Sequence, residues 1–256
     1  MSNRIRALLA SDVPQALALS QAAGWSQNHE DWRLAIELNP EGCFAMEHEG
    51  AIVATTTSIR YGTDLAWVGM VLTHPEFRGK GYARALTRRV LDYLSDVETV
   101  KLDATEMGAP LYRQLGFVEE CAIERWRGQS NSPPANVKDF TRHDALDREA
   151  FGADRSALLA RLAKFESASL EDAFAMGRGT RFGPCVSRSK ESALALATWF
   201  LARHADEPVL WDLFPENNLA EALGFECARR LTRMTRGRTL TGNKSLIYAG
   251  AGFEFG

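Results

Sequence analysis

The segment that says most about the fold of this chain is His74-Pro75-Glu76-Phe77-Arg78-Gly79-Lys80-Gly81-Tyr82-Ala83. It follows an apolar run that predicts a strand over 65–73, and it opens a pattern that predicts a helix over 81–94. Gly79 and Gly81 allow positive φ and a close approach of the backbone to a ligand. Free amides at a helix start, the helix dipole and two basic side chains together indicate a site for a diphosphate.

Two other phosphate loops fit this stretch less well. A Walker A loop needs Ser or Thr after Lys80, where Gly81 stands. The dinucleotide fingerprint needs a third glycine at the position of Arg84. An ordinary basic turn before a helix is the simplest alternative, but the strand before it and the small Ala83 after it favour a binding loop.

The regions on either side of the loop predict a mixed α+β domain. Upstream, we expect a strand over 5–9, helices after Ser11-Asp12 and over 28–38, and strands over 43–47 and 52–60. Downstream, we expect a strand over 100–104, a helix over 109–115 and a strand from Phe117 onward. The order is not the strict alternation of a doubly wound fold, so we expect a central, mostly antiparallel sheet flanked by helices.

The second half of the chain repeats the first in weakened form. Strand, Asp, short helix and Leu-Gly-Phe occur over 100–117 and again over 209–225. A polar linker with two prolines, 128–136, predicts domains 1–128 and 137–256. Coincidence of short motifs is the alternative to duplication. The second copy has no glycine in Ser187-Arg188-Ser189-Lys190-Glu191, so we expect that it neither binds the cofactor nor catalyses.

Composition excludes several classes of protein. The 256 residues carry a formal net charge of −3, which argues against nucleic-acid binding through a broad basic surface. No apolar run is long enough to span a membrane. The four cysteines are far apart and lack metal-ligand spacing, so we expect reduced thiols, no metal and a cytoplasmic protein.

The motif Val71 to Ala83 resembles the acetyl-CoA-binding signature of the GCN5-related N-acetyltransferase (GNAT) superfamily, and 110–117 resembles that family's second signature. The whole chain resembles the bacterial two-domain members with a divergent C-terminal acetyltransferase-like half. The segments that carry this likeness are Gly24-Trp25, Asp31-Trp32, Leu102 to Thr105, Phe151 to Arg155, Phe182 to Pro184 and Arg233 to Gly237.

The resemblance implies a cofactor, a reaction and a set of residues. The co-substrate would be acetyl-CoA, and an amine would attack its thioester directly. A backbone N–H near Met70 or Val71 would polarise the thioester carbonyl beside a family bulge, which we expect at Gly69. The implied cofactor-binding residues are Val71, Leu72, Thr73, Arg78, Gly79, Lys80, Gly81, Tyr82, Ala83 and Thr105.

Tyr112 stands where many relatives have a Tyr that protonates the departing thiolate, although a core Tyr is the alternative. The expected strand over 65–71 has no acid, whereas many relatives carry a Glu there as general base. Asp103, Glu106 and His74 are the candidates for that role, with Asp103 preferred and a turn-capping role as its alternative.

The acceptor side gives weaker signals. Trp25 and Trp32 lie in the region that borders the acceptor pocket in this fold, so they are expected to bind substrate or else to pack in the core. A basic cluster near the C-terminus indicates either a solvated strand face or an acidic substrate or partner; its members are Arg229, Arg230, Arg233, Arg236 and Arg238.

We therefore expect an N-acetyltransferase that acts on the amine of a small molecule. A non-catalytic acyl-CoA-binding sensor is the alternative, because the strand acid is missing and the second copy is degenerate. A protein lysine is a further option for the acceptor. The second copy is expected to wall the substrate cleft or to form a homodimer, with a degenerate second active site as the other possibility.

Overall fold

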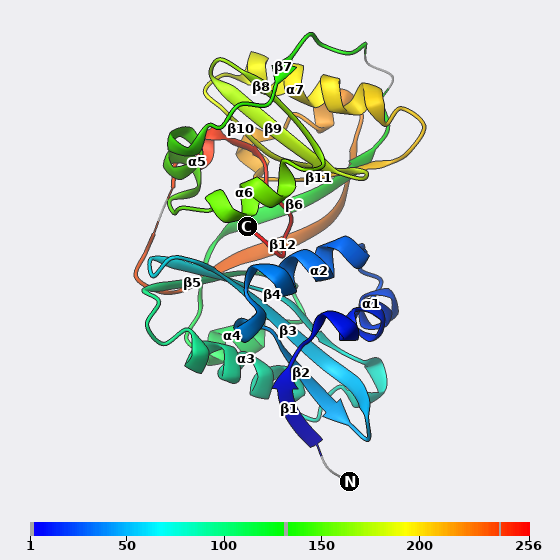
Figure 1. Ribbon diagram of the computed structural model, residues 1–256, viewed down its shortest axis with the longest axis vertical. Coiled ribbons are helices and arrows are strands. Elements are labelled where there is room, and N and C mark those ends of the chain that lie inside the picture. The colour runs from blue at the N-terminus through cyan, green and yellow to red at the C-terminus, as the bar shows by residue number, and fades with distance from the viewer. Residues whose placement is uncertain (1–2, 131–132, 241) are drawn as a thin grey trace.

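The computed structural model describes residues 3–130, 133–240 and 242–256, so the predicted linker residues Asn131 and Ser132 lie outside the described residues. Its first half has the predicted order of elements (Figure 1). These elements are β1 (Asn3–Ala7), α1 (Val13–Ala22), α2 (His29–Leu38), β2 (Phe44–His48), β3 (Ala51–Tyr61), β4 (Leu65–Thr73), α3 (Tyr82–Tyr93), β5 (Thr99–Ala104), α4 (Ala109–Gln114) and β6 (Val118–Gly128).

The second half repeats this order, which agrees with the expected duplication. Its elements are β7 (Lys138–Asp139), α5 (Asp144–Phe151), α6 (Ser156–Leu162), β8 (Glu166–Leu170), β9 (Ala173–Arg178), β10 (Arg181–Ser187), α7 (Lys190–Arg203), β11 (Val209–Leu213), β12 (Glu226–Gly237) and β13 (Ile247–Ala249). A 3-10 turn at Glu221–Leu223 takes the place of α4. The chain is therefore an α+β protein built from two similar halves.

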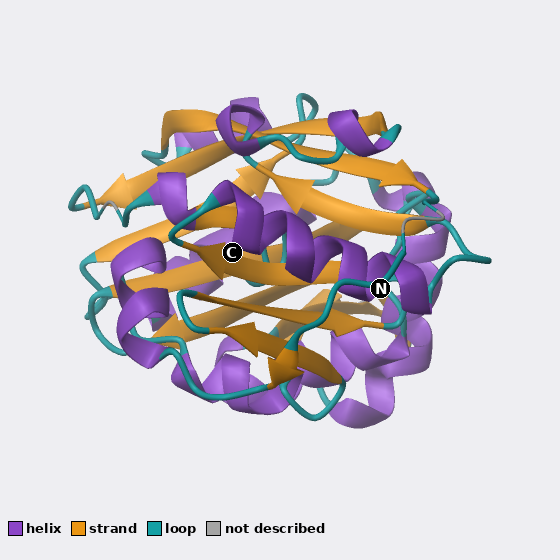
Figure 2. Cartoon of the chain, turned by 90° about the horizontal axis from the view of Figure 1, so that it is seen from above, coloured by secondary structure: helices purple, strands orange, loops and turns teal. Residues whose placement is uncertain are grey.

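The two halves exchange their last strands. The strands follow the order β1-β2-β3-β4-β5-β12-β6-β11-β10-β9-β8-β7 in one sheet, and β13 pairs with β10. β12 of the second half lies against β5 of the first, while β6 of the first half lies against β11 of the second. Figure 2 shows these strands crossing the molecule with helices on the outside. The strands of the two halves therefore interleave in the sheet. The predicted boundary at 128–137 divides the sequence into two copies, but it does not divide the sheet into two parts.

Local sequence explains where the helices of the first half begin. The Asn28 side chain accepts a hydrogen bond from the Asp31 amide (3.0 Å), and the Asp31 carboxylate accepts one from the Asn28 amide (2.9 Å). This reciprocal pair satisfies two backbone donors at the start of α2. Helix α3 starts differently, because its N-cap is Gly81 with φ +79° and no side-chain cap. The first turn of α3 therefore leaves its amides free for a ligand.

The core that joins the halves contains side chains from both. Trp67 of β4 packs near Phe151 of α5, with ring centroids 6.3 Å apart. The chain end, residues 250–256, is buried between the halves, where Figure 1 marks the C-terminus. The Trp67 indole N–H donates to the Phe253 carbonyl (2.9 Å), and the Tyr61 hydroxyl donates to the Phe255 carbonyl (2.6 Å). These contacts fix the last residues beside β4, where the site lies.

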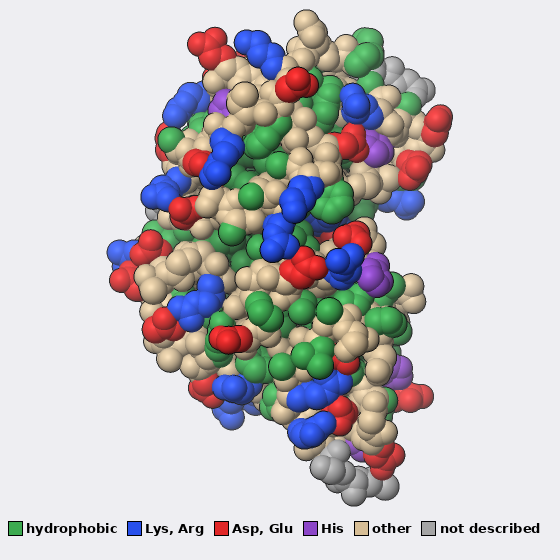
Figure 3. Space-filling view, viewed as in Figure 1, with side chains coloured by type: hydrophobic (Ala, Val, Ile, Leu, Met, Phe, Trp, Pro, Cys, Tyr) green, Lys and Arg blue, Asp and Glu red, His purple; other side chains and the backbone are tan. Residues whose placement is uncertain are grey.

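On the face drawn in Figure 3, acidic and basic side chains are interspersed, and neither sign dominates a large area. Among the described residues, no helix has the length and apolar character needed to cross a bilayer.

Candidate functional site

A cavity of about 600 Å³ lies against the open edge of β4. Strands β4 and β5 pair in parallel only at their beginnings, and the last paired residues are Trp67 and Lys101. Beyond this point the two strands separate, so one edge of β4 from Val68 to Thr73 faces the cavity. A strand with an unpaired edge can hydrogen-bond an extended ligand along its backbone.

A bulge on β4 shapes this edge. Gly69 pairs with Thr57, and Leu72 pairs with Thr55, so Met70 and Val71 together lie opposite a single residue of β3. Met70 has φ +47°, and its carbonyl accepts a hydrogen bond from the Thr55 hydroxyl (3.0 Å). The expectation of a bulge at Gly69 was wrong by one residue, because Gly69 stays in register.

Gly69 has another role, which is to admit the chain end. A Cβ at Gly69 would lie 3.0 Å from both the Cα and the carbonyl oxygen of Glu254. Any side chain at this position would therefore push residues 253–254 away from β4. Phe253 and Glu254 both line the cavity. Neither could be predicted from the sequence, because no helix or strand was expected at the chain end.

The glycine loop forms one end of the cavity. Gly79 and Gly81 have φ +77° and +79°, and a Cβ on either would meet no atom within 4 Å. The first helical bond of α3 runs from the Ala85 amide to the Gly81 carbonyl (3.0 Å), so the preceding amides have no helical partner. All the predicted cofactor residues line the cavity except Lys80, which is exposed and holds its Nζ 4.4 Å from the centroid of the Phe77 ring.

Tyr112 of α4 also lines the cavity. Within the described ranges, its hydroxyl has no hydrogen-bond partner in the protein, and burial raises the pKa of the phenol. The phenol is thus protonated and free to donate. Thr105, which also lines the cavity, accepts a hydrogen bond from the Gly108 amide (3.1 Å) at the start of α4.

Of the three candidate bases, only Asp103 lines the cavity. Its carboxylate is held by two bonds from Arg233, at 2.9 and 3.0 Å, and its side chain is fully buried. Burial raises the pKa of Asp103, and the Arg233 charge opposes that rise. Glu106 is exposed outside the cavity, and the His74 ring packs edge-on against Phe77.

Another part of the cavity lining consists of Trp25, Gln27, Arg229 and Leu231, together with the chain end, and is called the acceptor side after the expectation for Trp25. Trp32 does not belong to it. That side chain is fully buried, and its indole N–H donates to the Ser20 hydroxyl (3.1 Å), so the expectation that Trp32 binds substrate is corrected to a core role.

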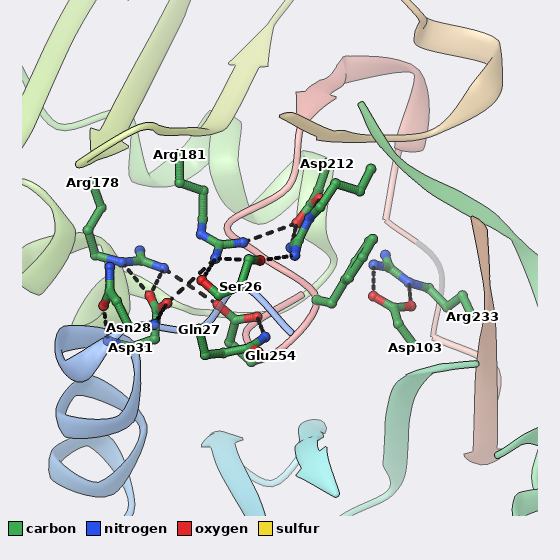
Figure 4. Close-up of polar contacts among 12 residues, drawn as sticks. Ser26, Gln27, Asn28, Asp31, Asp103, Arg178, Arg181, Asp212, Arg233 and Glu254 are labelled. Carbon is green, nitrogen blue, oxygen red and sulfur yellow. Dashed lines mark hydrogen bonds and ion pairs between the residues drawn. The ribbon is translucent and has the colours of Figure 1, made fainter. Parts of the chain in front are cut away.

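A buried ionic network joins the acceptor side to the second half (Figure 4). The Arg178 Nε donates to Asp31 of α2 (2.8 Å), and one Arg178 Nη lies 3.6 Å from the Glu254 carboxylate. Gln27 donates to the other oxygen of Glu254 (3.2 Å). The second half therefore helps to build the wall of the acceptor side.

The start of α7 differs from the start of α3. Ser189 caps α7 by accepting a hydrogen bond from the Ser192 amide (3.2 Å), which occupies the helix start with the chain's own side chain. Ala220 stands at the position that corresponds to Tyr112. In the parts of the chain that the structure describes, no group of three potential metal ligands occurs.

Comparisons with known proteins agree with this geometry. Residues 8–117 match the acetyltransferase (GNAT) family, and residues 144–249 match a second acetyltransferase (GNAT) domain. The chain is a two-domain member of the GNAT superfamily. GNAT proteins transfer acyl groups, generally from acetyl-CoA to amines, and this chain is accordingly an acyltransferase enzyme of the N-acetyltransferase type.

Individual relatives cover most of the chain. It is 26% identical over 212 residues to the uncharacterized N-acetyltransferase YitH of Bacillus subtilis, covering 73% of each chain. It is also 26% identical over 265 residues to holothin acyltransferase of Pseudoalteromonas, covering 92% of this chain and 88% of that one. A putative acetyltransferase of Pyrococcus horikoshii has the same fold, with a TM-score of 0.88, 19% identity, and coverage of 99% and 96%.

Proposed function

We propose that this GNAT protein transfers the acetyl group of acetyl-CoA to the amine of a small molecule by direct attack. One observation carries the proposal: the cavity runs without a break from the glycine loop, along the open edge of β4, to a separate wall made by Trp25 and the chain end. Such a cavity can hold a donor and an acceptor together, and this arrangement turns a bimolecular reaction into an intramolecular one.

The donor would lie along β4. The free amides between Gly79 and Ala83 would bind the diphosphate at the start of α3, where the helix dipole favours an anion. The backbone of Val71 and Thr73 would bond the pantetheine arm as an added strand. The amide of Met70 or Val71 at the bulge would donate to the thioester oxygen as negative charge develops there.

The chemistry needs one proton donor and one proton acceptor. The amine nitrogen attacks the thioester carbon, a C–N bond forms, and the C–S bond breaks. Tyr112 gives its phenolic proton to the departing thiolate, and the amine proton passes to Asp103. Burial raises the pKa of the Asp103 carboxyl, which makes it a stronger proton acceptor than an exposed carboxylate, although the Arg233 charge opposes that rise. Solvent then returns both groups to their starting states.

The acceptor is proposed to be small because its side of the cavity is walled by the second half and the buried chain end. The second half thus serves as a wall in this proposal. A cytoplasmic location and a homodimer remain predictions of the sequence.

The test is thiol release from acetyl-CoA with a panel of amines, polyamines, amino acids and aminosugars, with mass spectrometry of the products. Tyr112→Phe is expected to lower kcat about 100-fold or more, a typical loss for a positioned acid, with acetyl-CoA affinity unchanged. Asp103→Asn is expected to remove the acidic limb of the pH profile of kcat/KM. Acetyl-CoA binding without turnover of any amine would instead support the alternative, a non-catalytic acyl-CoA-binding sensor.

A further inference from the structure

The basic side chains that line the cavity fall into two groups. Arg78 and Arg84 belong to the glycine loop and α3, at the end proposed for the diphosphate. Arg229 of β12 lies on the acceptor side, beside Trp25 and Leu231. Its guanidinium carbon stands 5.6 Å from the centroid of the Trp25 ring. The Trp25 ring therefore supports one face of this cation.

Arg229 differs from the other members of the predicted basic cluster. Arg233 is neutralised by Asp103, Arg230 by Glu124 (2.9 Å), and Arg238 by Glu98 (2.8 Å). Arg236 is exposed and does not line the cavity. Arg229 alone joins the cavity lining, and among the described residues no carboxylate lies within ion-pair distance of it.

The surroundings of Arg229 add to its need for an anion. Its neighbour in the register with β6 is Arg125, another cation. Arg125 is already satisfied by two bonds to Asp212, both 2.6 Å long, and by Ser26. Partial burial lowers the pKa of Arg229 most, and the Arg125 charge lowers it further. The Asp212 charge raises it, but that carboxylate is already bonded to Arg125, so the free protein holds the Arg229 charge at a cost.

The acids of the acceptor side cannot meet that need. Asp103 is bound by Arg233, and the Glu254 carboxylate bonds Gln27 and lies 3.6 Å from Arg178. The acceptor side thus carries one cation without a counter-charge. Leu231 and Phe253 contribute apolar surface to the same wall.

We propose that the acceptor is an amine that also carries a carboxylate, bound by Arg229 over the face of Trp25, with its apolar part against Leu231 and Phe253. This inference rests on the proposed function, because it places the acceptor in the same cavity. It favours amino-acid-like acceptors over polyamines and neutral aminosugars. The paired geometry of a guanidinium and a carboxylate would supply the selectivity.

The experiment compares carboxylates with their neutral amides on protein saturated with coenzyme A. The probes are N-acetyl-leucine and N-acetyl-phenylalanine, each against its carboxamide, measured by calorimetry; the free amino acids and their amides are compared by kcat/KM. The wild type is expected to bind the carboxylates about 10-fold or more tightly than the amides, as a bond between charged groups implies. Arg229→Gln should bring the two affinities to within about threefold by removing that bond.

Arg230→Gln is the matched control, because this neighbour is exposed, paired with Glu124 and outside the cavity. It should keep the full preference, and both variants should keep the wild-type Tm and acetyl-CoA affinity. Equal binding of carboxylate and amide by the wild type, absence of binding at millimolar concentration, or an unchanged preference in Arg229→Gln would overturn the inference. Loss of acetyl-CoA affinity in Arg229→Gln would also overturn it by assigning Arg229 to the donor. If the wild type did not bind acetyl-CoA, the proposed function itself would be refuted.

Discussion

Replacing Gly81 by Asp tests the diphosphate site while leaving the cavity walls in place. Gly81 caps α3 with φ +79°, and a Cβ there would meet no atom within 4 Å, so the substitution causes no clash in the free protein. It adds a carboxylate to the turn where the proposed diphosphate would lie. Gly81→Ala adds the same Cβ without the charge, so the difference between the two variants isolates the charge.

The expected magnitude follows from that geometry. Positive φ costs a residue other than Gly about 1–2 kcal/mol of folding free energy, and Asp tolerates it better than most. A carboxylate about 4 Å from a phosphate charge costs about 1 kcal/mol in water and about 4 kcal/mol at the dielectric of a protein surface. We therefore expect Gly81→Asp to bind acetyl-CoA about 5-fold to 700-fold more weakly than Gly81→Ala, since 1.4 kcal/mol is a factor of ten.

Calorimetry with coenzyme A and acetyl-CoA measures this difference. Gly62→Asp is the control, because Gly62 also has positive φ (+71°) and no neighbour within 4 Å, but lies outside the cavity lining. It should keep wild-type affinity. Added salt should reduce the difference in acetyl-CoA affinity between Gly81→Asp and Gly81→Ala, because it screens exposed charges. If the two Gly81 variants bound within about threefold of each other, below the Coulomb estimate, the diphosphate would not lie at this turn.

Two further predictions concern buried ion pairs, one within the second half and one that joins the halves. Arg155 makes three bonds to Asp147, the shortest 2.8 Å, and one to the Gly256 carbonyl (2.9 Å). Arg155→Met should lower the free energy of unfolding in urea by about 3–5 kcal/mol, because it leaves the buried Asp147 carboxylate without a partner. Adding Asp147→Asn should recover part of that stability, whereas an unchanged urea midpoint in Arg155→Met would contradict the prediction. Burial works against ionisation of Asp31, but Arg178 and Arg181 lower the pKa of its carboxyl below 3.8. The ionised Asp31 should therefore contribute its full stability above about pH 4–5, and this contribution should be lost as the pH falls through the lowered pKa of the folded protein. If the free energy of unfolding were flat from about pH 5 to pH 2, the ion pairs of Asp31 with Arg178 and Arg181 would not stabilise the fold.

Local patterns predicted most of the first half correctly. The elements from β1 to β6 appear in the expected order, because each has an apolar period, a cap or a glycine turn in its own sequence. The glycine loop is also local, so its cofactor residues line one cavity as expected, apart from Lys80. Lys80 differs because a long side chain can turn to solvent and to the Phe77 ring without disturbing the backbone.

The fold class, the duplication and the glycine loop could be inferred from the sequence alone, because they depend on spacing within short segments. The strand exchange, the burial of Trp32 and the composition of the acceptor side depend on tertiary contacts, which the sequence does not reveal. Arg229 and Glu254 come beside Trp25 and Gln27 through contacts between residues some 200 positions apart in the chain. Such neighbours depend on how the two halves pack together in the folded chain, and no periodic pattern within a short segment records them.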